Sequence, residues 1–267
     1  MKRFMQSACF CILGLILMAS QAAAATMEEA REASRWRFTG GGVAIIAPDY
    51  EGSDQYRVRM LPLIDLTYGR HFFIQTHRGI GWRWAPNQSN WDASVAVAYR
   101  FGRKESDNPA LSGLGDIRGA AELVLTGSYS LAPWLFSADL RQQLDDQAGG
   151  MLVGLRGAWS IPGPGPKASM TLIPSIAWAN RNYMETRFQI DAVQALRSGY
   201  TPFQTGAGIK DLGLAWQLRY PITPRVSLTT LIGYSRLLGD AAQSPIVRQE
   251  GSAHQVRGIM GIGYSFK

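Results

Sequence analysis

The C-terminal segment constrains the fold of this chain more than any other feature. From Gln255 to Phe266, apolar residues alternate with smaller or more polar ones, and the apolar row ends in Tyr264 and Phe266. This period of two is that of a β-strand whose two faces differ. An apolar row with aromatic ends is typical of a lipid-facing strand in a closed barrel. The segment therefore predicts the closing strand of a transmembrane barrel, followed here by Lys267.

The N-terminus indicates export. Lys2 and Arg3 precede an apolar run over residues 8–19, which leads into an alanine-rich stretch ending at Ala25. A basic start, an apolar centre and small residues at the end are typical of a secretory signal peptide. The run is shorter than the roughly 20 residues that span a membrane. We therefore expect residues 1–25 to be removed.

The chemistry of the mature chain is limited by its composition. Both cysteines, Cys9 and Cys11, lie in the signal peptide, so the mature chain has no thiol. The net charge of +7 for the full sequence, or +5 once Lys2 and Arg3 are removed, is spread along the chain without a lysine or arginine run, which argues against a nucleic-acid partner. Three scattered histidines and no paired-histidine motif favour neither a metal site nor a cofactor.

Alternation of the same kind recurs along the chain and predicts an all-β, up-and-down antiparallel barrel over residues 36–267, preceded by a polar periplasmic arm over 26–35. Twelve strands are expected, or ten if the short third and fourth strands form a loop. The expected strands are 36–46, 57–68, 71–77, 79–84, 91–102, 117–131, 134–144, 150–160, 168–181, 208–220, 225–237 and 254–266.

The connections support this count. If the chain starts in the periplasm, the periplasmic turns are brief and the long connections 47–56, 103–116, 182–207 and 238–253 all lie outside. Short periplasmic turns and long external loops are the known asymmetry of outer-membrane barrels. The alternative is a secreted periplasmic β-sandwich, which also has alternating strands. We expect an outer-membrane barrel of a Gram-negative bacterium, in contact with outer-membrane lipid.

The residues expected to face the lumen include more arginine than carboxylate. These candidate lumen charges are Arg57, Arg59, Arg100, Arg118, Glu122, Asp139, Arg141, Arg156, Asp211, Arg219 and Arg257. Such a lumen would favour anions in a narrow channel or solute-uptake porin. Alternatively, the charges pair across neighbouring strands and brace the interior.

Some outer-membrane barrels are enzymes, so a catalytic serine–histidine pair is a further possibility for this chain. Only His254 has a serine nearby, Ser252, and no nucleophile elbow or acidic partner lies at a telling spacing. A lipid-modifying or hydrolytic barrel is therefore the third reading, and we expect no enzyme activity.

Four loop segments carry a more specific signal. Their candidate motif residues are Asp49, Tyr50, Gly52 and Ser53, then Asn108, Gly113, Gly115 and Asp116, then Tyr183, Ser198 and Gly199, and finally Gly239, Asp240, Ser244 and Pro245. In this order and spacing, over nearly the whole mature chain, they resemble the MipA/OmpV family. The third segment departs from the family pattern at residues 186–190.

The resemblance implies an outer-membrane scaffold that holds a murein lytic transglycosylase near a bifunctional penicillin-binding protein. Other family members look like adhesion, osmotic-response or drug-susceptibility proteins. Murein enzymes work in the periplasm, whereas the four segments are expected outside. We therefore expect the loops to fold inward as a plug, leaving the periplasmic rim free for partners.

Overall fold

The computed structural model describes residues 35–144, 149–165 and 167–266. The predicted signal peptide and the predicted arm up to residue 34 lie outside these ranges. The strands are β1 (Trp36–Pro48), β2 (Tyr56–Tyr68), β3 (Phe72–Gln75), β4 (Gly79–Trp84), β5 (Trp91–Arg100), β6 (Ala120–Leu131), β7 (Trp134–Gln143), β8 (Met151–Pro162), β9 (Ser169–Ala179), β10 (Gly208–Pro221), β11 (Val226–Leu237) and β12 (His254–Phe266). Among the described residues, the short helices lie in the connections: η1 (Glu105–Asp107), η2 (Pro109–Leu111), α2 (Arg181–Phe188), α3 (Ala192–Ser198), α4 (Gly239–Gln243) and α5 (Pro245–Arg248).

The strands form one closed antiparallel barrel in sequence order. It is closed by β1 and β12, which pair from Phe38 opposite Phe266 to Ile46 opposite Gly258. Both β3 and β4 are paired on each side, which confirms twelve strands rather than ten. The predicted boundaries agree closely with the structure. The largest shift at a strand start is in β6, expected at residue 117 and found at Ala120.

The outward rows of the strands are apolar, as the alternation predicts. In β10, for example, Leu212 and Leu214 are each 47% exposed on the outside. Asp211, which precedes Leu212, and Gly213, which lies between the two leucines, face inward. Where strands pair with neighbours on both sides their backbone groups are satisfied, so such a wall can lie in hydrocarbon. In the part of the chain that the structure describes, no helix is long and apolar enough to cross a membrane.

Aromatic side chains ring the end of the barrel that carries the short turns. Trp84 and Trp91 meet edge to face with ring centroids 5.0 Å apart, and Trp134 stacks on Trp159 at 5.7 Å. Trp36 packs on the ring of Tyr68 at 4.8 Å. Amphipathic rings settle at the level of lipid head groups, so this ring marks one membrane interface.

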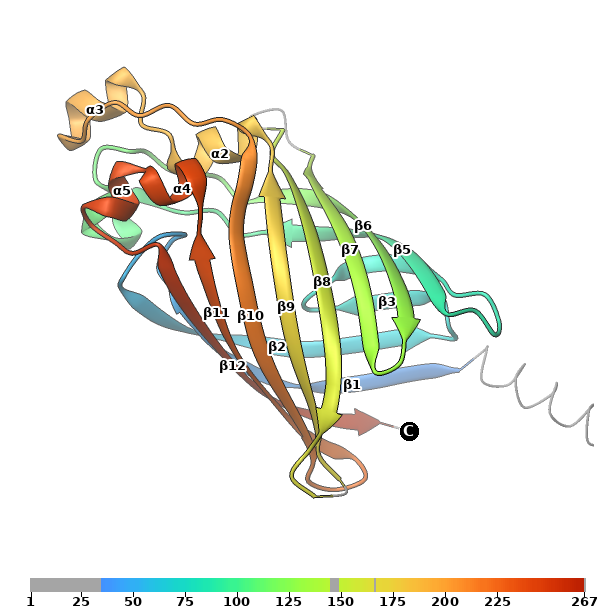
Figure 1. The fold of residues 1–267 in the computed structure, drawn as a ribbon. Helices are drawn as coiled ribbons and strands as arrows, with labels where there is room; N and C mark the ends of the chain where they lie inside the picture. Colours follow the sequence, from blue (N-terminus) through green and yellow to red (C-terminus); the bar gives the residue numbers. More distant parts are fainter. Residues whose placement is uncertain (1–34, 145–148, 166, 267) are drawn as a thin grey trace, which may run out of the picture.

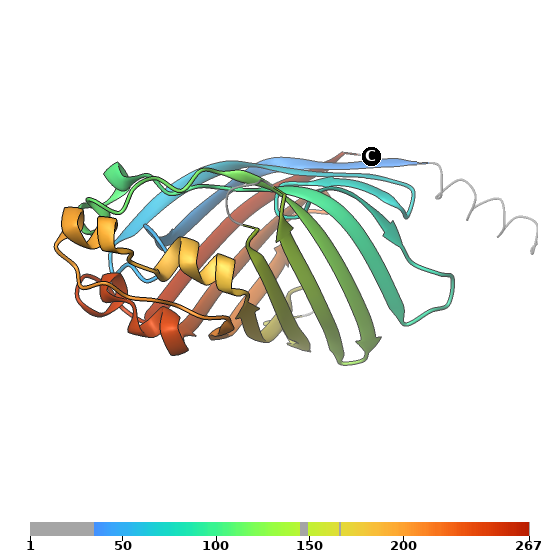
Figure 2. The same cartoon turned by 90° about the horizontal axis from the view of Figure 1, so that it is seen from above.

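The two ends of the barrel differ. Helices α2 to α5 gather at one end, while the start of β1 and the end of β12 lie at the other (Figures 1 and 2). The turn end is periplasmic and the helical end is external by the known asymmetry of outer-membrane barrels. One connection differs from the prediction. The sequence predicts the β3–β4 turn at the outer end of the barrel. However, β3 pairs with β2 only from Asp65 to Tyr68, so this turn lies part-way along the barrel wall and does not reach the outer end.

The lumen has two dissimilar walls. One inward row crosses four neighbouring strands and consists of Arg59 on β2, Ile45 on β1, Ile259 on β12 and Leu231 on β11. The next inward row contains Leu61 opposite Val43. This wall is more apolar than the alternation predicted. The charged residues concentrate instead on the wall formed by β5 to β8.

Candidate functional site

The four long connections fold over one another at the outer end of the barrel (Figure 2). We call this assembly the cap and define it as residues 49–55, 101–119, 180–207 and 238–253. Ser53 bridges to Gly251 and so joins the first and last cap segments, while the bridges Arg103 to Ile117 and Ile190 to Phe203 each close one connection on itself.

The cap has its own hydrophobic core. Phe188 and Leu111 are fully buried there, and Met184 is 2% exposed. From the cap the core contains Tyr50, Leu111, Leu114, Tyr183, Met184, Phe188, Ile190, Ala241, Ile246 and Val247, and the adjoining strand ends add Ala179 of β9 and Leu237 of β11. Since buried apolar area is the main source of folding free energy, the four connections form a packed unit rather than independent loops.

Buried polar contacts fix the segments to one another. The Ser244 hydroxyl donates to the Phe188 carbonyl at 2.6 Å, and the Tyr200 hydroxyl donates to the Ala110 carbonyl at 3.0 Å. Asn108 donates from Nδ2 to Asp49 Oδ2 at 3.0 Å. Burial is the main cause that raises the pKa of Tyr50 to about 12, so its hydroxyl stays protonated. It donates towards carbonyls of the fourth connection at 3.3 Å.

All of the motif residues singled out in the sequence lie in the cap. Tyr50, Ser53, Asn108, Tyr183, Ser244 and Pro245 are buried, and Asp240 Oδ2 accepts from the Gly206 amide at 2.7 Å. Asp116 is exposed and accepts from the Glu105 amide, and Ser198 Oγ donates to the Gln194 carbonyl. The glycines Gly52, Gly113, Gly115, Gly199 and Gly239 all have positive φ. The family-like segments therefore share one structural role, which is to build the packed cap.

Gly199 illustrates that role and leads to a prediction. It ends α3 in the left-handed conformation at φ 80°, with no atom within 4 Å of where a Cβ would lie. Gly199→Ala should therefore lower cap stability by about 1 kcal/mol through backbone conformation alone. Hydrogen exchange of cap peptides, followed by mass spectrometry, measures this opening free energy. Gly208→Ala is the matched control, because that site is equally open and lacks a positive φ. Equal effects of the two changes would contradict the assignment.

A charged cluster lies where the cap meets the lumen. Glu51 accepts from Lys210 Nζ at 3.0 Å and from the Tyr183 hydroxyl at 3.0 and 3.1 Å. Arg187 Nε lies 3.8 Å from Glu51, and Arg100 donates to the Tyr183 oxygen at 3.2 Å. Burial alone would raise the pKa of Glu51, but the three cations outweigh it and hold that pKa well below its ordinary value.

A β-bulge supplies the lysine of this cluster. The β9–β10 register shifts between Ile209 and Asp211, so Lys210 and Asp211 both face inward and their side chains meet at 2.5 Å. A bulge inserts one residue and breaks the alternation of side chains. Strict alternation placed Lys210 outside, so the sequence prediction missed it.

Below the cluster, alternating charges run across the inner wall. Glu122, 2% exposed, pairs with Arg100 and lies 3.7 Å from Arg141. Arg141 lies 3.4 Å from Asp139, which also pairs with Arg156. These five predicted lumen charges therefore form the cross-strand ladder that the sequence left as one of two readings.

The other predicted lumen charges behave differently. Arg57 pairs with Asp49 at 2.6 Å and with Asp107 at 3.3 Å, which fastens β2 to the cap. Within the described residues, the exposed side chains of Arg59, Arg219 and Arg257 form no ion pair. Arg118 was predicted on a strand, but it precedes β6 and is exposed. The predicted start of this strand at residue 117 is wrong, because β6 begins at Ala120.

The histidine considered for catalysis makes structural contacts. His254 Nδ1 lies 2.6 Å from the Tyr234 hydroxyl, and Ser252 Oγ accepts from the backbone amide of His254 at 3.0 Å. The Ser252 hydroxyl therefore interacts with backbone rather than with the imidazole. Among the described residues, no group of three histidine, aspartate or glutamate side chains is placed to hold a metal ion.

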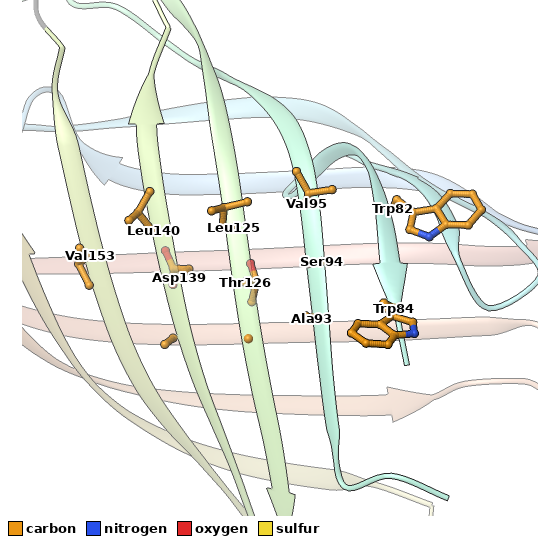
Figure 3. Close-up of a pocket in the computed structure, with 12 residues that line it drawn as sticks. Trp82, Trp84, Ala93, Ser94, Val95, Leu125, Thr126, Asp139, Leu140 and Val153 are labelled. Carbon is orange, nitrogen blue, oxygen red and sulfur yellow. The ribbon is translucent and has the colours of Figure 1, made fainter. Parts of the chain in front are cut away.

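A groove of about 570 Å³ crosses the outside of β4 to β8 (Figure 3). Its upper edge is an outward row of successive strand neighbours, in which Val95, Leu125 and Leu140 are labelled side by side. Ala93, Gly127 and Ala138 also line the groove, and their small side chains leave the hollow in the surface. The groove therefore lies on the lipid-facing surface and does not belong to the lumen.

The chain is similar to one described protein family and to several solved structures. A family model described as MltA-interacting protein MipA matches residues 40–266. Among solved structures, the NanC porin is 11% identical at a TM-score of 0.42, covering 86% of this chain and 99% of that one. An outer membrane channel from Pseudomonas putida F1 is 13% identical at a TM-score of 0.40, covering 86% and 95%. A comparison with curated proteins finds no match.

Proposed function

Because the chain belongs to the family described as MltA-interacting protein MipA, we propose that it is a non-enzymatic outer-membrane scaffold for murein-remodelling enzymes. The protein is an outer-membrane β-barrel of the Gram-negative type, with an apolar wall and external cap. Its partners in this proposal are a murein lytic transglycosylase and a penicillin-binding protein, and they bind from the periplasm.

The charge of the periplasmic rim carries the proposal. The turns 69–71, 85–90, 132–133, 163–168 and 222–225 contain no aspartate or glutamate. They contain Arg70, Lys167 and Arg225, all exposed, and Arg35 lies beside them before β1. Every acidic residue of the long connections lies at the opposite end. The short turns themselves carry charge of one sign, and such charge steers and orients partners with complementary acidic surfaces.

The cap supports the same assignment by its position. Its motif residues are engaged with one another and with the outer mouth of the barrel, through contacts such as Tyr183 to Arg100 and Asp49 to Arg57. The periplasmic turns make no comparable packed unit within the described residues. The surface available to a periplasmic enzyme is therefore the basic rim.

Binding of purified enzymes to the folded barrel tests the proposal. The triple change Arg70→Glu, Lys167→Glu and Arg225→Glu should weaken binding of a murein lytic transglycosylase by about tenfold or more at low salt, because rim charges steer association. Biolayer interferometry on the detergent-solubilised barrel measures the affinity. The control reverses three exposed arginines of the cap, Arg181, Arg197 and Arg248, and should change binding by less than about twofold.

Two results would contradict the scaffold. One is absence of binding by the unaltered barrel to either murein enzyme, and the other is equal loss in the cap control. A narrow anion channel is the second candidate, favoured by the unpaired lumen arginines Arg59, Arg219 and Arg257. In planar bilayers that channel predicts anion-selective conductance that falls in Arg219→Gln, whereas the scaffold predicts no dependence on Arg219.

A further inference from the structure

The outer part of β2 has a neighbouring strand on only one side. β2 pairs with β1 along its whole length, from Tyr56 to Tyr68. On its other side, β3 covers only residues 65–68, and β4 meets β5 only up to Ile80 opposite Val97. Figure 1 shows this short hairpin between β2 and β5. Above the hairpin, the described strands leave the β2 edge unpaired over residues 56–63.

The tip of the hairpin marks where pairing stops. The Thr76 amide donates to the Ile64 carbonyl at 3.0 Å, and Thr76 Oγ1 accepts from the Ile64 amide at 2.9 Å. The same hydroxyl lies 2.9 Å from the Pro62 carbonyl. Backbone groups of alternate residues face the same edge, so those of Met60 and Val58 face it as well. Neither has a partner there in the described chain.

Side-chain exposure locates the same break independently. Met60 is 76% exposed, Val58 and Tyr99 are each 62% exposed, and Phe101 is 60% exposed. Among the exposed large apolar side chains of the described residues, only Leu196 of the cap helix α3 exceeds them all. Met60 and Val58 lie on β2, Tyr99 lies on β5 and Phe101 follows β5 directly, so they flank the unpaired stretch on two sides. The wall therefore lacks neighbouring side chains as well as backbone pairing at this place.

The break is bounded rather than continuous with the outer mouth. Above it, connection 101–119 is fastened to β2 through the Arg57–Asp107 ion pair. Asn108 of the same connection donates to Gln55 Oε1 at 3.1 Å, just before β2 begins. Below it lies the tip at Thr76. We call this bounded stretch of the outer wall, where the β2 edge has no strand partner, the window.

Water inside the barrel must reach this window. Unpaired backbone groups facing hydrocarbon cost several kcal/mol each, and non-helical backbone at membrane depth is tolerated where it lines a water-filled space. Pro62 also lacks an N–H at this edge, which removes one unpaired donor. Proline further obstructs the addition of another strand, so a polypeptide partner paired along β2 is disfavoured.

The lumen behind the window is amphipathic. Arg57 and Arg59 face inward from β2, and Arg78 at the hairpin tip donates to Ser94 Oγ at 2.7 Å. Directly below Arg59 on β2, Leu61 and Leu63 also face inward, beside the apolar wall of β1 and β12. Cations above aliphatic side chains match a molecule with an anionic head and an apolar tail.

We propose that this window between β2 and β5 is a lateral portal through which an anionic membrane lipid enters the lumen from the outer half of the bilayer. Its acidic head group binds at Arg59, which has no ion-pair partner among the described residues. Its acyl chain lies along Leu61 and Leu63. The proposal concerns the wall of the barrel and is independent of partner binding at the periplasmic rim.

Site-specific fluorescence quenching tests the portal, and the mature chain needs no cysteine removal because it has none. A bimane label on Leu61→Cys is placed in vesicles containing brominated phosphatidylglycerol or brominated phosphatidylcholine. The control label is on Ala215→Cys, an inward site of β10. Quenching at 61 should be about twofold stronger with the anionic lipid, while 215 shows no such difference. Adding Arg59→Gln should abolish the preference at 61.

Three outcomes would overturn the portal. Equal weak quenching at 61 and 215 would show that lipid does not enter. Equal quenching at 61 by both lipids, unchanged by Arg59→Gln, would remove the anionic head-group site. Disulfide-linked dimers of Met60→Cys in the bilayer would instead show that the β2 edge pairs with a second copy. The heat-dependent electrophoretic mobility typical of folded barrels verifies that each variant is assembled.

Discussion

Phe188→Ala should open the cap while leaving the barrel wall assembled. Phe188 ends α2, is fully buried, and is among the largest buried side chains of the cap core. Truncating a buried phenylalanine to alanine costs about 3–5 kcal/mol, because transfer free energy is lost and a cavity remains. The cap contains only short helices and loop, so little other structure compensates for that loss.

Hydrogen exchange of peptides from the four cap segments measures the effect. Exchange in all four segments should accelerate together in Phe188→Ala, since their side chains share one core. Leu196→Ala is the matched control. It lies in the same connection but is 88% exposed, so its effect should stay within about 0.5 kcal/mol. Acceleration confined to α2, with the other segments unchanged, would show that the cap is not one cooperative unit.

Glu51→Gln should release the cap from the charged inner wall. The carboxylate holds Lys210, whose side chain is only 7% exposed, and also faces Arg187 and Tyr183. Removing one partner of a buried ion pair costs about 3–5 kcal/mol, because the remaining charge stays desolvated. Asp211 still contacts Lys210, so we expect the lower end of that range. External protease cleavage within 180–207 on intact cells measures the release.

The same carboxylate sets the acid sensitivity of the cap. Its pKa in the folded protein is lowered from the ordinary value of 4.5, so its contribution to stability is fully present above 4.5. That contribution declines as the pH falls below 4.5 towards the folded pKa. Glu51→Gln should therefore flatten the acid dependence of cap opening. Glu250→Gln, an exposed change in the same cap, should leave the dependence as in the unaltered protein.

Strand positions were predictable from sequence because each wall residue faces either lipid or lumen. The alternation of apolar and polar residues then determines the pairing register of a strand and the side to which each residue points, as in β5 and β10. The short β3 and β4 were uncertain because four to six residues carry too few alternations. Their pairing, and the end of the hairpin within the wall, depend on contacts with β2 and β5 that local pattern does not encode.

The cap was predictable only in part. The motif residues were correctly singled out, but their mutual packing depends on contacts such as Ser244 with Phe188, 56 residues apart. No periodic pattern reports such contacts. Glu51 and Lys210 were not singled out: Glu51 lies within the first motif segment but its partners come from distant strands and helices, and Lys210 lies where a bulge reverses its face. The inward charges of β5 to β8 were identified by alternation, since no bulge interrupts them.

The seam between the first and last strands carries a clasp at its outer end. Beyond the β1–β12 ladder, Ser53 pairs with Gly251, and Gln255 Oε1 accepts from the Gly52 amide at 3.1 Å. Contacts between residues some 200 positions apart form late, after intervening chain has been ordered. The clasp therefore cannot close until synthesis, export and insertion of the last strand are complete. Its formation is a molecular signature of finished biogenesis, distinguishing mature barrels from those still held open during assembly.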